Sequence, residues 1–259
     1  MFDFFKNRAF GRKKAIVMAA ESHVGCVRQN NEDSFVYVND PAEQNAMAVV
    51  CDGIGGHSHG EVASFMCCSK MLEEWRNQKV GNRSDPAELK SFLEWIIEQS
   101  NQEIRTQNAT MQNERPMGCT VVAAIITPNT LIVANAGDSR CYGQYRNVMT
   151  QLSFDHTLRS LMQAKSSEII AEEDLPGSNI ICKAVGPCSR VKPAVGIFER
   201  KNYRKLLLCS DGMTGMIDDD EINTILHNSR TPNAVINQLI CTALKRGATD
   251  NVTGISIYC

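Results

Sequence analysis

Short apolar runs bounded by turn residues recur along most of the chain and predict a core rich in β-strands. Runs of this kind cover residues 15–19, 35–38, 46–51, 118–126, 131–136, 141–143, 148–152, 195–198, 205–209 and 254–258. Tight turns such as 127–130 join several neighbouring runs, which favours antiparallel pairing. The pattern therefore predicts antiparallel sheets.

Four longer stretches have the 3.6-residue spacing of amphipathic helices. They cover about 60–79, 86–111, 219–228 and 232–246. Ser84 or Asp85 is the expected cap of the second helix. The short loop between the first two helices predicts antiparallel neighbours in one layer on a sheet.

Residues 153–186 have a weak pattern and predict a surface excursion, which is unusual in a compact domain unless it has a function. The rest of the chain contains no repeat, low-complexity segment or linker that would divide it. We therefore expect one domain over 15–259 and a basic extension over 1–14. The extension lacks the apolar core of a signal peptide. A frayed terminus is favoured for it over a membrane-surface helix.

Composition excludes several classes of function. The chain has 259 residues and a formal net charge of -2, so no basic excess points to nucleic acid. No apolar run approaches the roughly 20 residues that cross a bilayer. The 11 cysteines include no C-x-x-C pair, and several lie inside apolar runs. This usage favours a reducing cytoplasm and argues against a disulfide scaffold and against a zinc site.

Acidic residues share one setting, at the edge of an apolar run beside a turn. Asp52 alone is more simply interpreted as a solvated turn residue. The others in this setting are Asp138, Asp211 and Asp250, and Glu32-Asp33 flank a further run. If these carboxylates converge they repel one another unless cations neutralise them. Oxygen ligands of this kind favour Mn²⁺ or Mg²⁺ over zinc.

Five motifs occur in an order that resembles a known family. They are Arg28-x-x-x-Glu32-Asp33, Asp52-Gly53-Ile54-Gly55-Gly56-His57, Gly137-Asp138-Ser139-Arg140, Ser210-Asp211-Gly212 and Asp250-Asn251-Val252-Thr253. Together they resemble the metal-dependent serine/threonine phosphatases of the protein phosphatase 2C class, in its bacterial branch. The resemblance implies an α+β fold, an α-β-β-α sandwich of two central antiparallel sheets flanked by helix pairs.

The resemblance also implies a metal site. Asp52 should bridge two ions, with the Gly53 carbonyl as a further ligand. Asp211 and Asp250 should hold one ion and Glu32 the other. A bridging water or hydroxide would attack phosphorus directly, without a phosphoenzyme.

Further roles follow from the same resemblance. Arg28 matches a phosphate-binding arginine, and Asp33 would orient water from behind the metal ligands. Asp138, with Asp211, matches a third and weaker metal site. These roles imply a hydrolase that removes phosphate from serine and threonine in proteins.

Two departures from the family pattern bear on the chemistry. Ile54 stands where animal-type members carry a histidine proposed as general acid. His57 is the candidate substitute, although an idle, exposed histidine is the simpler interpretation. Residues 153–186 match the family's flap only loosely, which bears on the choice of substrate and on the third metal site.

Two other functions remain open on the sequence. One is a catalytically weak module that binds phosphoproteins. The other is a phosphatase dedicated to a single regulatory partner. We expect a cytoplasmic monomer that acts on phosphorylated proteins, in opposition to a serine/threonine kinase.

Overall fold

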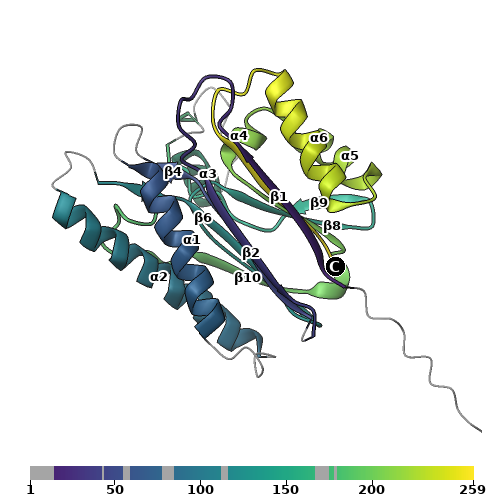
Figure 1. The fold of residues 1–259 in the computed structure, drawn as a ribbon, viewed down its shortest axis with the longest axis horizontal. Helices are drawn as coiled ribbons and strands as arrows, with labels where there is room; N and C mark the ends of the chain where they lie inside the picture. The colour runs from purple at the N-terminus through teal and green to yellow at the C-terminus, as the bar shows by residue number, and fades with distance from the viewer. Residues whose placement is uncertain are drawn as a thin grey trace, which may run out of the picture.

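The computed structural model describes residues 15–42, 44–54, 59–77, 85–111, 116–166, 175–177 and 180–259. Within these ranges two five-stranded antiparallel sheets lie face to face, and helices cover their outer faces (Figure 1). The predicted α-β-β-α sandwich is confirmed. The basic extension at 1–14 lies outside the described residues.

The first sheet joins the beginning of the chain to its end. Its strands in spatial order are β1 (Val17–His23), β12 (Val252–Tyr258), β11 (Lys205–Cys209), β8 (Arg140–Tyr145) and β9 (Val148–Gln151). Helices α5 (Asp219–Asn228) and α6 (Pro232–Lys245) cover its outer face. A short helix, α4 (Asp211–Thr214), follows β11 directly.

The second sheet carries the other helix pair. Its strands in spatial order are β10 (Ala194–Glu199), β7 (Thr130–Ala136), β6 (Val121–Ile126), β3 (Asn45–Cys51) and β2 (Ser34–Asp40). Helices α1 (Gly60–Asn77) and α2 (Pro86–Met111) pack side by side on it, as the helical spacing predicts. A two-stranded ladder of β4 (Gly53–Ile54) and β5 (Gly118–Cys119) continues the neighbouring strands β3 and β6 beyond their ends.

Strand residues alternate between two apolar layers, which is the two-residue period of a sheet covered on both faces. In β3, Met47, Val49 and Cys51 face the α1–α2 pair, and Ala46, Ala48 and Val50 face the other sheet. In β11, Leu207 and Cys209 face α5–α6, and Leu206 and Leu208 face inward. The small alanines of β3 allow the sheets to approach closely.

Helix starts follow the expected capping chemistry. Asp85 Oδ1 accepts a hydrogen bond from the Ala87 amide at 2.8 Å, so the structure assigns Asp85 as a cap of α2. The alternative, Ser84, lies outside the described residues. Thr231 caps α6 and is followed by Pro232 in the first turn, where a missing N–H costs nothing.

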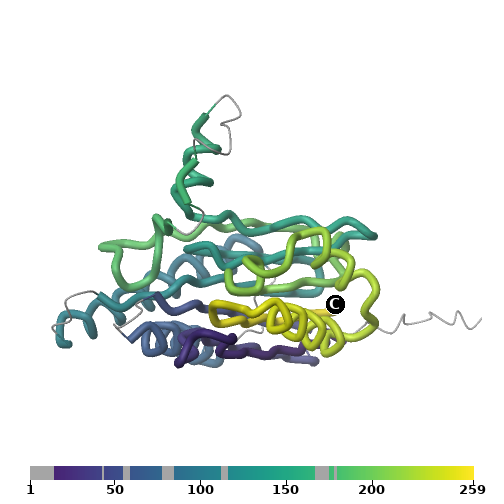
Figure 2. The backbone as a smooth tube through the Cα atoms, turned by 90° about the horizontal axis from the view of Figure 1, so that it is seen from above, coloured from purple at the N-terminus to yellow at the C-terminus, as the bar shows by residue number. Residues whose placement is uncertain are grey.

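Two predicted segments differ from the structure. The run at 118–126 is two strands, because Thr120 leaves the ladder and bonds to Asp52 instead. The excursion at 153–186 contains a helix, α3 (Leu158–Lys165), and a 3₁₀ turn not predicted from sequence spans Arg200–Asn202. Figure 2 shows α3 standing away from the two sheets. No helix in the described ranges is long and apolar enough to cross a membrane.

Candidate metal centre

Asp52 is fixed at both of its backbone groups immediately after β3. Its amide donates to Thr120 Oγ1 at 3.1 Å, and its carbonyl accepts from the Thr120 amide at 2.8 Å. Thr120 is fully buried, and its hydroxyl also lies 2.7 Å from Ser139 Oγ. The backbone that carries the Asp52 carboxylate is therefore held rigidly by the strand beside it.

Gly53 lets two other segments approach this turn closely. Its amide donates to the Glu32 carbonyl at 3.1 Å. A Cβ at Gly53 would lie 2.5 Å from the backbone of Gly60 and 2.6 Å from the Glu32 carbonyl oxygen. Gly60, the first residue of α1, is equally confined, because its own Cβ would lie 2.5 Å from Glu32 Oε2. These contacts place the Glu32 carboxylate beside the Asp52 turn and the start of α1.

Asn251 holds the Glu32 segment against the start of β12. Its Oδ1 accepts from the Glu32 amide at 2.8 Å, and its Nδ2 donates to the carbonyls of Val24 and Asn30, each at 2.9 Å. The side chain is 5% exposed. One buried amide thus joins residues from the two ends of the chain and sets the distance between Glu32 and Asp250.

Asp33 is a buried carboxylate with one unpaired oxygen. Its Oδ2 accepts from Ser210 Oγ at 2.7 Å, whereas Oδ1 has no hydrogen-bond partner among the described residues. Burial and the charges of Asp211 and Asp250 together raise the pKa of Asp33 to about 7, although the hydrogen bonds of Thr253 and Ser210 lower it. A metal-free Asp33 is therefore partly protonated near neutral pH.

Asp52 and Asp211 lie within hydrogen-bonding reach of each other. Burial raises the pKa of both carboxyls; the charges of Asp33 and Asp211 add to the shift at Asp52, and that of Asp250 adds to the shift at Asp211. Asp211 begins α4, and Gly212 lets this helix pack on the backbone of Asn251, where a Cβ would be only 2.0 Å from its carbonyl oxygen. The strand-to-helix turn therefore directs Asp211 toward Asp52.

Asp138 joins the group from the turn after β7. It is 7% exposed, and its Oδ1 has no hydrogen-bond partner among the residues that the structure describes. Burial raises the pKa of Asp138 to about 7, with the charge of Asp211 as the next cause. The preceding Gly137 has a φ of 109° and packs against Thr120, the residue that also fixes Asp52.

A cavity of about 340 Å³ opens beside Asp138 and Asp211, and α3 forms part of its wall. The segment before α3 is anchored to the Asp138 turn, because the His156 amide donates to the Gly137 carbonyl at 2.9 Å. Asp155 is held by Arg140, whose Nη2 lies 2.7 Å from Asp155 Oδ2. Burial lowers the pKa of His156 to about 4, so this histidine is neutral at pH 7.

Arg28 lies at the solvent-exposed side of the group. Its Nη2 donates to Asp250 Oδ2 at 2.8 Å, and both side chains are close to half exposed. The second oxygen of Asp250 accepts from the Asn251 amide at 2.8 Å. Arg28 thus contacts a predicted metal ligand and leaves part of its guanidinium open to solvent.

The donor set fits divalent cations with a preference for oxygen. Buried carboxylates that raise one another's pKa, two of them with an orphaned oxygen, carry a desolvation cost that a cation offsets. In the described ranges, no three carboxylates place one oxygen each within 4.8 Å of the others, so their oxygen atoms do not all converge on one point.

The candidate general acid at His57 lies outside the described residues, as do Gly55 and Gly56. Ile54 is described and belongs to the β4–β5 ladder. The nearby His59 is exposed, with a left-handed backbone at φ 62°, and its Nδ1 lies 3.6 Å from Glu61 Oε1. This exposed position indicates no role for His59 at the carboxylate group.

Comparison with known proteins decides the family. A family model described as "Protein phosphatase 2C" matches residues 23–239. The chain belongs to the protein phosphatase 2C family. Serine/threonine phosphatase stp of Listeria monocytogenes serotype 4b (strain F2365) is 32% identical over 232 residues, 88% of this chain and 90% of the relative.

Solved structures agree with this protein phosphatase 2C assignment. Serine/threonine phosphatase Stp1 from Staphylococcus aureus superposes with a TM-score of 0.84 at 29% identity, over 96% of this chain and 98% of that one. The catalytic domain of the phosphatase PstP, in complex with two manganese ions, gives a TM-score of 0.77 at 28% identity, over 94% and 97% of the two chains.

In this protein phosphatase 2C chain, three residues hold the site together although the sequence analysis assigns them no role. Ser210 and Asn251 stand inside recognised motifs, and their adjacency to Asp211 and Asp250 is the signal that could have indicated them. Thr120 had no such signal, because it interrupts a run of strand residues. All three act through hydrogen bonds to distant segments, which residue spacing does not reveal.

Proposed function

We propose that the protein is a metal-dependent protein serine/threonine phosphatase that hydrolyses phosphoserine and phosphothreonine on proteins. The observation that carries the proposal is the buried carboxylate group around Asp52, in a chain of the protein phosphatase 2C family. The named relative from Listeria is a serine/threonine phosphatase, which agrees with this activity.

The residues divide into ligands and positioning groups. Asp52 would hold both ions, with the Gly53 carbonyl as a further ligand, Glu32 on one side and Asp211 and Asp250 on the other. When bound, the two cations supply a water of lowered pKa and neutralise charge on the phosphoryl oxygens. The PstP structure with two manganese ions supports Mn²⁺ as one suitable metal, and Mg²⁺ fits the same oxygen donors.

Other residues would bind the substrate and orient water. Arg28 would bind the phosphate dianion through the part of its planar guanidinium that Asp250 does not occupy. Asp33, fixed by Ser210, would orient water through Oδ1. Asp138, with Asp211, would form a third metal position at the cavity beneath α3. His57 remains a candidate proton donor.

We also propose a cytoplasmic monomer, with one catalytic domain over 15–259, that opposes a serine/threonine kinase. All the proposed ligands come from one chain, so no second copy is required to complete the site. All 11 cysteines are free thiols, which suits a reducing compartment. Light scattering of the purified protein tests the monomer directly, because a dimer would double the mass.

A panel of phosphoserine, phosphothreonine and phosphotyrosine peptides tests the activity. We expect phosphate release from the first two classes with Mn²⁺ or Mg²⁺, and none with a chelator. Metal-independent binding of phosphopeptides without turnover would replace this proposal with the binding-module alternative. Turnover confined to one phosphoprotein would instead favour a phosphatase dedicated to a single partner.

A further inference from the structure

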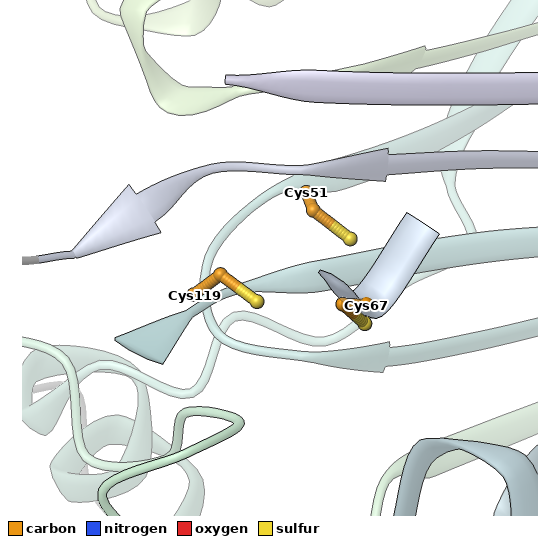
Figure 3. A group of neighbouring side chains, drawn as sticks. All are labelled: Cys51, Cys67 and Cys119. Carbon is orange, nitrogen blue, oxygen red and sulfur yellow. The ribbon is translucent and has the colours of Figure 1, made fainter. Parts of the chain in front are cut away.

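Three thiols meet behind the Asp52 turn. Their sulfur atoms, on Cys51, Cys67 and Cys119, all lie within 4.8 Å of one another, and each residue is fully buried. Figure 3 shows that they come from three separate elements, the end of β3, helix α1 and strand β5. Among the described residues this is the only group of three potential metal ligands that converges so tightly.

The three thiols are held in place by the elements around them. The Cys119 amide and carbonyl exchange hydrogen bonds with Val185 at 2.9 and 2.8 Å, and its Sγ lies 3.6 Å from the Ala63 carbonyl on α1. Cys67 lies one turn after Ala63 on the same helix. All three belong to the apolar core between this helix pair and the second sheet. The ligand set is therefore fixed before any ion binds.

We propose that Cys51, Cys67 and Cys119 form a binding site for a thiophilic d¹⁰ cation of the Cu(I) class, separate from the carboxylate group. Soft thiolates select soft cations, whereas Mn²⁺ and Mg²⁺ bind oxygen. Zinc takes four ligands, or three and a water. A fourth thiol, Cys68, interacts with Cys51 but lies outside the converging group of three, which suits a three-coordinate ion better. Binding replaces thiol protons, which leave to solvent, without oxidation or reduction of sulfur.

The change in geometry that binding requires is small. Metal–thiolate bonds of about 2.3 Å in a trigonal plane place the sulfur atoms about 4 Å apart. Because the sulfurs already lie within 4.8 Å of one another, no pair has to close by more than about 1 Å. No helix or strand has to unfold to complete the coordination.

Occupation of the site would act on Asp52 through the backbone. Cys51 directly precedes Asp52, and Cys119 pairs with Gly53 and precedes Thr120, which holds Asp52 at both backbone groups. Any movement of the sulfurs on binding is therefore passed to the backbone that carries the Asp52 carboxylate. The expected consequence, which rests on the proposed phosphatase activity, is inhibition by a soft metal at a site that substrate never contacts.

The test uses the full chain with its three exposed thiols replaced, Cys26→Ser, Cys182→Ser and Cys241→Ser, so that binding at these thiols is removed. Anaerobic titration with Cu(I) buffered by a chelator should load one ion per chain. Thiolate charge-transfer absorption and emission typical of solvent-shielded Cu(I)–thiolate centres should appear together. Neither signal depends on phosphatase activity.

Cys67→Ala in the same background should weaken Cu(I) binding by more than about 100-fold and abolish the emission. Cys141→Ala is the matched control, since Cys141 is equally buried but belongs to the core between the two sheets. If Cys67→Ala does not fold by circular dichroism, Cys119→Ser replaces it. Equal binding by the cluster variant and the control, or no binding at all, would overturn the site and leave three packed thiols.

The coupling to Asp52 is read separately, as Mn²⁺-dependent phosphate release before and after one equivalent of Cu(I). Loss of activity in the background protein, and not in Cys67→Ala, supports the coupling. Cu(I) binding with unchanged activity would overturn the coupling and retain the site. A protein that binds Cu(I) but never releases phosphate would contradict the proposed function alone.

Discussion

At the residue scale, the candidate centre is an arrangement of carboxylates that is unfavourable without cations. Asp33 and Asp138 are both more than nine-tenths buried, and each keeps one oxygen unpaired among the described residues. Their pKa values rise to about 7 because water is excluded and other aspartates are near. Charge neutralisation by metal is the simplest way to relieve both effects.

Asp138→Asn tests this cost through the pH dependence of stability. The carboxyl has a higher pKa in the folded chain than in the unfolded chain, about 7 against 3.8. Between these values the folded chain binds more protons, so the free energy of unfolding falls as pH rises. With a chelator present, Asp138→Asn should exceed the wild type in stability at pH 8 by up to about 4 kcal/mol and match it near pH 4. Urea unfolding at both pH values measures the difference, and an equal offset at both would refute the assignment.

Asp52→Ala and Asp211→Ala should each reduce metal-dependent phosphate release by more than about 100-fold, because each removes a ligand rather than a supporting group. Both variants should remain folded, since the lost carboxylate was costly to bury. Steady-state kinetics with Mn²⁺, together with circular dichroism, measures the two effects. Activity retained in either variant would contradict the ligand assignment.

At the element scale, sequence pattern predicts most helices and strands but not the interruptions that shape the site. Helix 86–111 and strand 205–209 match the structure at both ends, because capping residues and apolar runs are local signals. Thr120 breaks the run at 118–126 for a partner 68 residues away. The amphipathic pattern of α3 spans only eight residues, which is too short to stand out from a polar surface segment.

Gly53→Ala tests the close packing of the β4 turn on α1. The added Cβ meets backbone atoms at 2.5 Å, which cannot rotate away, so the free energy of unfolding should fall by about 1–3 kcal/mol. Activity should fall with it, because Glu32 and the start of α1 move outward. Gly247→Ala is the control: its φ of 77° costs about 1–2 kcal/mol, but no atom lies within 4 Å of the added Cβ. Similar activity loss in both variants would contradict a specific role for the Gly53 contact.

At the scale of the whole molecule, the motifs converge because strands distant in sequence pair with one another. Residues 17–23 pair with 252–258, which brings the Arg28–Asp33 segment to Asp250 and Asn251. The spacing of apolar and polar residues along the chain does not reveal which distant strands pair. The two-sheet sandwich was therefore predicted from the family resemblance and not from that spacing. The thiol cluster shows the same limit, since its cysteines are 16 and 52 residues apart along the chain.

Asn251→Ala tests the connection between the two ends of the chain. It leaves the Glu32 amide and two carbonyls without their partner, so the free energy of unfolding should fall by about 2–4 kcal/mol. Metal affinity should also fall, because Glu32 loses its position relative to Asp250. Asn233→Ala, on the exposed face of α6, should change stability by less than about 0.5 kcal/mol. Chemical unfolding and Mn²⁺ titration measure both effects, and equal stability of the two variants would contradict the connection.

The position of β12 between β1 and β11 has a consequence for how the protein is made. Synthesis runs from β1 to β12, so β1 waits for this partner until the other strands of both sheets have been made. Asp250 and Asn251 directly precede β12 and are made with it. A nascent chain therefore cannot assemble the proposed metal ligands early, and the first sheet and the candidate metal centre are completed in one closing step.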